Sequence, residues 1–354
     1  MALVNLIGFQ DWEVGTLTSN MTPNSVNLLP IDTSISGVGL GIATFFAGTP
    51  TRINQFTDSR GVVRKGIGMQ ANVNGAAYLR YTNQYLAMIP HTGKWYFGAR
   101  YNGPQIGTMA SVRLSNNAVV SWVPPTQIAT ATTLYFELAV DWVAKTFDLY
   151  VNKVKVASGV ADPASTVGNW NIIFGTTSGT GIAWSWTDLY WVVEGPDEAH
   201  PLPGPLGPIF VQRSPIKSVE NAELFVPPGS LSVGDQWNAN AVVPTYAGTT
   251  NVANAVTTSP HGETASVHFT EPAETAPILA VSWNLSTFKT QVANAGTASQ
   301  VVDGSNSLPQ TKEIPAVTTS ANVNQHGSTV ALDGSAWTKE AVGRTVFNVG
   351  SYRP

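Results

Sequence analysis

The chain has 354 residues, a formal net charge of −4 from 18 Lys+Arg and 22 Asp+Glu, and 11% charged residues, whereas globular domains carry about 25%. Its 43% hydrophobic content is enough for a sizeable core, which excludes global disorder. The absence of cysteine excludes disulfides and thiolate metal sites, the few basic residues argue against nucleic-acid binding, and no run of 18 apolar residues predicts a membrane span.

Short runs of β-favouring residues follow one another along residues 1–194. The first nine residues predict a strand and not a signal peptide, because they lack a basic region and a small-residue cleavage site. The runs 133–142 and 146–156 predict a β-meander that turns at Asn152-Lys153. Further strands are predicted at 76–81, 94–101, 108–114, 119–123, 169–176 and 182–194.

A boundary between two domains follows this series of strands. Residues 194–208 contain five Pro and three Gly in fifteen residues, a composition that prevents strand pairing and favours an extended chain. The sequence therefore predicts a first domain at 1–194, a linker at 195–207 and a second domain at 208–354. We expect limited proteolysis to cut first in this linker, because exposed Pro/Gly-rich backbone lacks protection.

The second half also predicts mainly strands, at 208–212, 266–270, 278–288 and 346–352. Residues 338–342 form the one helical pattern, with Ser335 as its candidate cap. Residues 324–327 predict a loop, and 219–265 match no clear pattern. Many short strands with few helices indicate an all-β protein, a jelly-roll sandwich followed by a second mostly-β domain.

One strand carries two carboxylates that a catalytic pair would need. Glu137 and Asp141 lie four residues apart on one strand face, which separates their Cα atoms by about 13–14 Å. A retaining glycosidase needs about 5–5.5 Å between its carboxyl groups, so solvated surface carboxylates are the better interpretation. The five histidines form no nucleophile or metal motif; they are His91, His200, His261, His268 and His326. We predict that the chain is not an enzyme and has no catalytic residues.

Acidic residues are densest at Glu194, Asp197 and Glu198, at the start of the predicted linker. Calcium sites use six to eight oxygens, with several carboxylates close in sequence. Linkers commonly carry such charges in contact with water, so we predict no specific metal and no cofactor.

Aromatic residues near the end of the first domain suggest one binding surface. Trp184, Trp186 and Tyr190 share strand parity and would form a row on one face, with Trp191 on the opposite face. If the row is exposed, its rings can stack on sugars. If it faces inward, it belongs to the core, which is the commoner place for such rings.

The order of several motifs resembles the concanavalin-like or laminin-G-like jelly rolls of tailed-bacteriophage virion proteins. The motifs are Gly8-Phe-Gln-Asp-Trp12, the 134–142 strand with its 147–156 hairpin, Thr187-Asp-Leu-Tyr-Trp-Val192, Leu206-Gly-Pro-Ile-Phe-Val211, Asp333-Gly-Ser-Ala-Trp-Thr-Lys339 and Val346-Phe-Asn-Val349. The resemblance implies a concanavalin-like first domain. It also implies a non-enzymatic virion structural protein, such as a fibre, collar, baseplate or capsid-surface component.

Such a protein would be made in the host cytoplasm and would reside on the particle surface. Its partners would be other virion proteins and further copies of itself, with no nucleic acid or membrane. The uncharged run 242–256 in the second half is the predicted contact between copies in a homo-oligomer, by resemblance a trimer or hexameric ring. Alternatively, the second half docks on a different virion protein. Two other functions stay open: an adhesin that binds a host-surface glycan, and, less favoured, a glycan hydrolase or lyase.

Overall fold

The structure is a computed structural model, and the described part of the chain consists of several ranges. These are residues 3–8, 15–16, 26–27, 42–46, 51–58, 61–69, 77–82, 92–102, 110–113, 119–122, 133–160, 171–176, 185–240, 256–258, 262, 264–273, 275–287, 295–313 and 322–354. No helix within these ranges is long and apolar enough to span a membrane.

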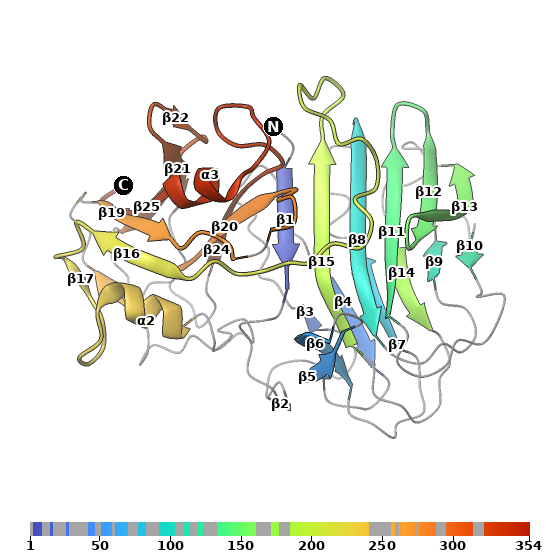
Figure 1. The fold of residues 1–354 in the computed structure, drawn as a ribbon, viewed down its shortest axis with the longest axis horizontal. Helices are drawn as coiled ribbons and strands as arrows, with labels where there is room; N and C mark the ends of the chain where they lie inside the picture. The colour runs from blue at the N-terminus through green and yellow to red at the C-terminus, as the bar shows by residue number, and fades with distance from the viewer. Residues whose placement is uncertain are drawn as a thin grey trace.

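A nine-stranded antiparallel sheet, here called the front sheet, dominates the first half (Figure 1). Its order is β13-β12-β11-β8-β15-β6-β5-β2, and β1 pairs with β15 beside β6. The strands are β1 (Leu3–Ile7), β2 (Gly15–Thr16), β5 (Thr51–Thr57), β6 (Val63–Met69), β8 (Lys94–Asn102), β11 (Thr133–Asp141), β12 (Thr146–Val151), β13 (Val154–Val160) and β15 (Ser185–Glu194).

A six-stranded sheet, the back sheet, forms the second layer of the sandwich, with the order β10-β9-β14-β7-β4-β3 (Figure 1). Its strands are β3 (Val26–Asn27), β4 (Ile42–Phe46), β7 (Ala77–Thr82), β9 (Ala110–Arg113), β10 (Val119–Trp122) and β14 (Asn171–Thr176). All described pairings in both sheets are antiparallel.

Aromatic side chains fill the inner face of the front sheet. The Trp95 ring lies 4.8 Å from Trp142 and 6.0 Å from Trp191, both edge-on, and Phe97 stacks on Trp191 at 4.8 Å. All four rings are at most 4% exposed. Offset and edge-on ring pairs stabilise a core beyond the area that they bury. This cluster therefore accounts for Trp95 and Phe97, the aromatic residues at two inward-facing positions of β8.

The second half is built on another six-stranded sheet with the order β16-β19-β25-β21-β22, and β23 also pairs with β21. Its strands are β16 (Ile216–Glu220), β19 (Thr264–Phe269), β21 (Gly296–Asp303), β22 (Asn306–Ser307), β23 (Thr311–Glu313) and β25 (Val346–Tyr352). Two further strand pairs are β17 (Phe225–Val226) with β18 (Thr257–Thr258), and β20 (Val281–Thr287) with β24 (Asn322–Ser328). The described helices are α2 (Val233–Asn240) and α3 (Lys339–Arg344).

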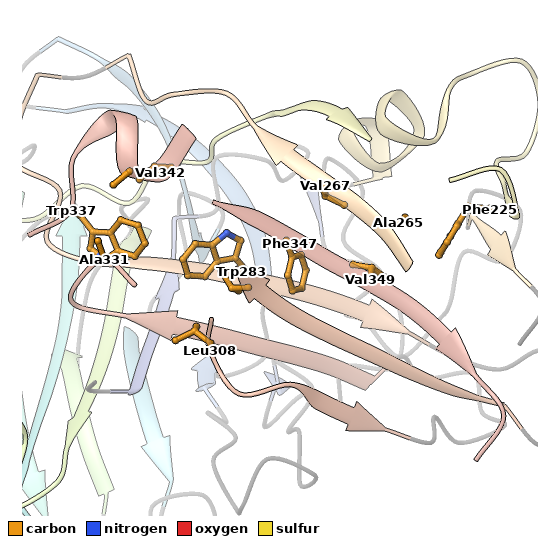
Figure 2. Packing of buried hydrophobic residues seen from close by; sticks show 12 residues of the cluster. Phe225, Ala265, Val267, Trp283, Leu308, Ala331, Trp337, Val342, Phe347 and Val349 are labelled. Atoms are coloured by element: carbon orange, nitrogen blue, oxygen red, sulfur yellow. The ribbon is translucent and has the colours of Figure 1, made fainter. Parts of the chain in front are cut away.

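The core of the second half lies on one face of this sheet (Figure 2). The strand register places four apolar residues side by side across it: Val219, Val267, Phe347 and Val301. Trp283 and Trp337 pack against this face, with ring centroids 5.7 Å apart. A row of directly opposed apolar side chains is the unit that stabilises a sheet, and it accounts for the buried side of the four strands.

The predicted fold class is confirmed: the chain is all-β, a sandwich followed by a second mostly-β part. Every strand predicted for the first half overlaps an observed strand. In the second half, the predicted strand at 208–212 is wrong, because these residues do not pair with any strand of the described residues. The predicted loop at 324–327 is also wrong: it lies within β24, where the buried His326 ring meets Phe347 edge-on.

Both helices correct the sequence analysis. The α3 cap is Thr338, whose side chain accepts the Ala341 N–H, and Ser335 instead donates to Asp333. Helix α2 was not predicted, although its start carries a readable signal. The Ser232 hydroxyl accepts the Asp235 N–H, as the side chain of an N-cap residue does, and donates to the Asp235 carboxylate.

The predicted linker is not free of the sandwich. Residues 202–211, here called the strap, lie against the outer face of the front sheet, and Gly207 is buried there. Leu202, Leu206 and Ile209 pack on an apolar cluster of that face, and Ala280 from the second half joins the same cluster. Strand β1 pairs with β15 and also contacts β20 and β24, so the two halves meet at both places.

Candidate functional site

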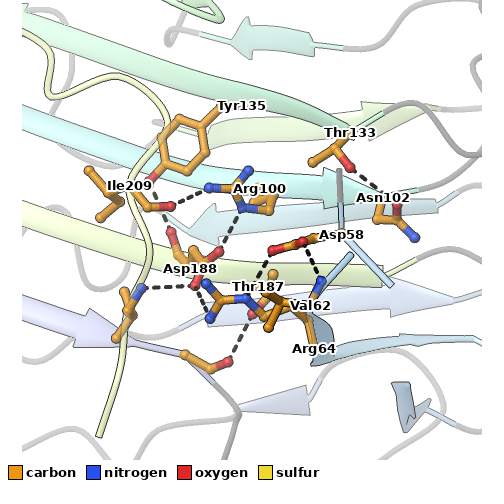
Figure 3. Close-up of polar contacts among 12 residues, drawn as sticks. Asp58, Val62, Arg64, Arg100, Asn102, Thr133, Tyr135, Thr187, Asp188 and Ile209 are labelled. Atoms are coloured by element: carbon orange, nitrogen blue, oxygen red, sulfur yellow. Dashed lines mark hydrogen bonds and ion pairs between the residues drawn. The ribbon is translucent and has the colours of Figure 1, made fainter. Parts of the chain in front are cut away.

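Charged side chains are buried on the outer face of the front sheet, beneath the strap (Figure 3). The Arg100 Nε lies 2.6 Å from Asp188 Oδ2, and Arg64 Nη1 lies 3.8 Å from Asp188 Oδ1. The Arg64 Nε also lies 3.3 Å from Asp58 Oδ2. All four residues are at most 5% exposed. Two guanidinium groups and two carboxylates therefore balance each other in a site that is almost closed to solvent.

A β-bulge in β15 places Asp188 in this site. Thr187 pairs with Arg100, but the next paired residue, Tyr190, lies opposite Gly98, so Asp188 and Leu189 together oppose one residue of β8. Asp188 has a φ of 49°, in the left-handed region that is strained for a residue with a side chain. The bulge therefore directs this carboxylate to the outer face, toward Arg100.

The same bulge corrects the predicted aromatic row. Trp186 lies opposite Tyr101, on the inner face, where its ring is 4.9 Å from Tyr101 and 5.9 Å from Phe136. Tyr190 lies on the outer face in the cluster beneath the strap. The two residues thus occupy opposite faces, and Trp191 shares the inner face with Trp186. In a regular strand, residues two apart lie on the same face. The extra residue at the bulge reverses the face of every residue that follows it.

Both described members of the proposed glycan-binding set are buried: Trp186 is 0% and Tyr190 1% exposed. Sugar stacking needs a ring face in contact with solvent, so neither ring offers that surface in this structure. Trp184, the third member, lies outside the described residues. The core interpretation that the sequence left open therefore fits Trp186 and Tyr190.

Glu137 is a further buried carboxylate of the outer face, although the sequence analysis placed it in solvent. It is 0% exposed, and its Oε1 accepts the Tyr190 hydroxyl at 2.6 Å and the Gly207 N–H at 2.8 Å. Burial raises the pKa of Glu137, against the opposing effect of its hydrogen bonds with Tyr190 and with the backbone of Gly207 and Leu206. Asp141 keeps partial exposure beside Lys94, so the predicted surface position fits Asp141 and is wrong for Glu137.

Two tyrosines, Tyr135 and Tyr190, lie between the charged site at Asp188 and the carboxyl group of Glu137. The Tyr135 and Tyr190 rings stack at 6.4 Å and 10°, and the Tyr135 hydroxyl donates to the Asp188 carbonyl at 2.9 Å. Burial raises the pKa of both hydroxyls well above the usual value. Tyr190 lies flat on Gly98, where an added Cβ would come within 2.0 Å of its ring. The absence of a side chain at Gly98 is thus a condition for this packing.

The strap binds to these groups through its backbone. The Val211 N–H donates to Asp188 Oδ1 at 2.9 Å, the Leu202 N–H donates to Glu194, and the Ile209 carbonyl accepts from Arg100. Phe210 lies beneath both guanidinium groups, with Arg100 at 4.1 Å and Arg64 at 4.5 Å from its ring centroid. With the Gly207 bond to Glu137, three buried carboxyl groups each accept at least one backbone N–H of the strap.

Glu194 was predicted to be a solvated linker residue, and this is wrong. It is the last residue of β15, is 1% exposed, and burial raises its pKa. Asp197 remains exposed, as predicted. Within the described ranges, no three His, Asp or Glu side chains are grouped so that they could hold a metal ion.

Asp58, Arg64, Arg100 and Asp188 were missed as site residues. The available signal was a charged residue inside an otherwise apolar strand: Arg100 interrupts the aromatic run of β8, and Asp188 interrupts that of β15. Because charged residues are almost never fully buried without a partner, opposite charges in two such strands indicate a buried pair. The chemistry of this arrangement is that of a receptor for extended backbone, with carboxylates for N–H groups and a guanidinium for a carbonyl.

The histidines lie in separate places. His200 is exposed, His268 lies 3.6 Å from Glu220, and His326 contacts Ser299 Oγ at 2.9 Å in the core of the second half. Burial lowers the pKa of His326 to about 4. His91 and His261 lie outside the described residues.

No protein-family model matches the sequence, and no curated protein matches it. Among solved structures, domain 4 of AbnA, a GH43 extracellular arabinanase from Geobacillus stearothermophilus in complex with arabinotriose, is similar with a TM-score of 0.30 and 15% identity, over 55% of this chain and 93% of that one. Peanut lectin with a bound nonapeptide has a TM-score of 0.26 and 10% identity, over 49% of this chain and 97% of the lectin. Arcelin-5, a lectin-like defence protein from Phaseolus vulgaris, has a TM-score of 0.25 and 7% identity, over 55% of this chain and all of arcelin-5. At such TM-scores, these likenesses to lectin-like and glycan-active proteins carry no argument about function.

Proposed function

We propose that the chain is a non-enzymatic structural protein of a bacteriophage virion, a fibre, collar, baseplate or capsid-surface component held by protein–protein contacts. The observation that carries the proposal is the engagement of Glu137, Asp188 and Glu194 by the strap. The buried carboxylates of the front sheet bind the chain's own backbone, and so they fasten the second half to the sandwich. A protein that bears load within a particle needs such a connection between its parts.

Composition and sequence resemblance support the same role. With 11% charged residues, much of the surface is uncharged and is therefore cheap to remove from water at a subunit contact. The motifs shared with virion jelly rolls include Thr187–Val192 and Leu206–Val211, the two segments that meet through Asp188 and Val211. The proposed partners are other virion proteins and further copies of this chain. Of the uncharged run 242–256, proposed as the contact between copies, only Val256 lies within the described residues.

Imaging of the parent particle with an antibody against this chain tests the proposal. We expect the label at a fixed, repeated position on the particle, and the chain among the proteins of the purified particle. Light scattering after size exclusion of the purified chain should give a symmetric oligomer. A strictly monomeric chain that is absent from purified particles would contradict the proposal.

A glycan array separates the adhesin alternative from the structural role. Binding that is lost in Trp184→Ala, with the fold intact, would favour an adhesin. Release of reducing sugars from capsule or exopolysaccharide would instead favour an enzyme. The structural proposal expects neither result.

A further inference from the structure

Two hydrogen bonds to Glu137 meet at the same oxygen. The Tyr190 hydroxyl and the Gly207 N–H both donate to Oε1, at 2.6 Å and 2.8 Å, and the Leu206 N–H of the strap is a further donor to this carboxyl. The second oxygen, Oε2, is buried and has no hydrogen-bond partner among the described residues. A buried ionised carboxylate normally receives donors on both oxygens, because each unsatisfied charged oxygen carries a large desolvation cost.

Glu137 also differs from Asp188 in its charged neighbours. Asp188 has two guanidinium groups within 4 Å, whereas no basic side chain of the described residues forms an ion pair with Glu137. The titratable groups that face Glu137 are Tyr190 from β15, Tyr135 from its own strand β11, Tyr150 from β12 and Lys153 from the turn before β13. Of these groups, only Lys153 lowers the pKa of Glu137 by its charge. This effect is smaller than that of each hydrogen bond to Glu137.

This geometry suits a neutral carboxyl group. With its proton on Oε2, Glu137 keeps Oε1 as a carbonyl acceptor for the Tyr190 hydroxyl and the Gly207 N–H, so the neutral carboxyl retains both of these contacts. Ionisation places charge on the unpartnered oxygen, among tyrosine rings and the apolar strap residues. Burial accordingly raises the pKa of Glu137, because removal from water disfavours the charged form, and this is the largest effect on the pKa.

We propose that Glu137 is a protonation switch on the connection between the two halves: the neutral carboxyl holds the strap on the front sheet, and ionisation loosens it. The sign follows from linkage. A carboxyl whose pKa is higher with the strap bound than with the strap released takes up protons when the strap binds. The bound strap is therefore favoured at lower pH and is weakened as the pH rises through the pKa of the bound state.

Hydrogen exchange of the Gly207 amide tests this proposal in the full-length chain. Its protection factor, corrected for intrinsic exchange, should fall as the pH rises, by at most about tenfold per pH unit. Glu137→Gln keeps the carbonyl acceptor and cannot ionise, so its protection factor should fall much less over the same range; the remaining fall comes from Glu194 and Asp188, which also bind the strap and whose pKa values burial also raises. Asp148→Asn, which removes a carboxylate of β12 that bonds Lys155 and Ser158, should keep the pH dependence of the unaltered chain. An equal pH dependence in the unaltered chain and Glu137→Gln would overturn the proposal.

Infrared difference spectra provide a readout that does not depend on that variant's folding. The carbonyl band of the buried protonated carboxyl should disappear with its midpoint at the pKa of the bound state, which is the pH at which the Gly207 protection factor stops falling. Tyr190→Phe removes a donor that favours the ionised form, so the band midpoint and the end of the fall in protection should move together to higher pH. A band midpoint that does not coincide with the end of the fall, or a Tyr190→Phe variant in which only one of the two moves, would show that Glu137 does not control the strap.

Discussion

At the scale of single residues, Asp188 is the acceptor that the strap shares with two arginines. Its carboxylate contacts Arg100, Arg64 and the Val211 N–H, and all of its oxygens are buried. Breaking a buried ion pair by removing one partner leaves the other charge uncompensated, which is far more costly than the pair is stabilising.

Asp188→Asn should therefore lower the free energy of unfolding by about 3–5 kcal/mol. The matched control is Asp148→Asn, because the Asp148 pair with Lys155 is partly exposed and such pairs are worth at most about 1 kcal/mol. Urea unfolding followed by tryptophan fluorescence measures both. Similar losses in the two variants would contradict the view that Asp188 balances the buried arginines.

Gly98 supports the Tyr190 ring, which in turn donates to Glu137. Gly98→Ala would bring a methyl group within 2.0 Å of Tyr190 Cε1 and 3.0 Å of the Tyr135 hydroxyl. Displacement of the two rings should cost about 1–3 kcal/mol, the usual range for overpacking a core. Gly195→Ala is the control, because no atom lies within 4 Å of its added Cβ. Thermal unfolding measures the difference, and equal midpoints for the two variants would exclude tight packing at Gly98.

At the scale of elements, helix α2 covers the free edge of strand β16. The Asn238 side chain accepts the Ile216 N–H and donates to the Ile216 carbonyl, each at 2.9 Å, and it also accepts from Arg213. A side-chain amide thus takes the place of a neighbouring strand, which protects an edge that would otherwise be open to pairing with another chain.

Asn238→Ala should expose that edge. The loss of two backbone hydrogen bonds should reduce stability by about 1–3 kcal/mol, and the freed edge should increase self-association. Light scattering as a function of concentration measures the association, with the exposed Lys217→Ala on the same strand as control. Unchanged scattering in Asn238→Ala would show that the edge is covered by other means.

Local patterns predicted most strands but not the candidate site, for physical reasons that differ by element. Strands β8 and β11 were readable because aromatic and β-branched residues mark them over nine residues each. The faces of Trp186 and Tyr190 were not readable, because the bulge at Asp188 changes the alternation without a distinct local signal. Burial of Glu137 depends on the strap, which lies 70 positions away in sequence. Two signals were present and not used: the charged residues Arg100 and Asp188 inside apolar strands, and the helix cap at Ser232.

At the scale of the whole molecule, the connection between the halves has an exposed part and a bound part. Residues 195–201 are mostly exposed, whereas the strap is bound to the sheet through its backbone. The sequence predicts protease cleavage anywhere in 195–207. The structure restricts the predicted cleavage to the exposed residues 195–201.

Within 194–212, a glutamate-specific protease should cut after Glu198 and leave Glu194 intact, since Glu194 is 1% exposed. The two pieces should then stay together, because the strap remains attached to the second half and still binds the front sheet. Mass spectrometry locates the cut, and size exclusion under native conditions measures co-elution. Separation of the pieces after a cut at Glu198 would show that the strap contacts are too weak to hold them.

Backbone recognition of the strap also bears on how the sequence can change over time. The sheet contacts the N–H groups of residues 202, 207 and 211 and the carbonyl of residue 209, and most side chains can be exchanged without altering those groups. Gly207 is an exception, because its φ of 77° and its contact with Lys153 disfavour any side chain. Homologues could thus diverge along the strap while keeping its path, and a saturation library of 202–211 should tolerate apolar exchange at 202, 206 and 209 but almost none at 207.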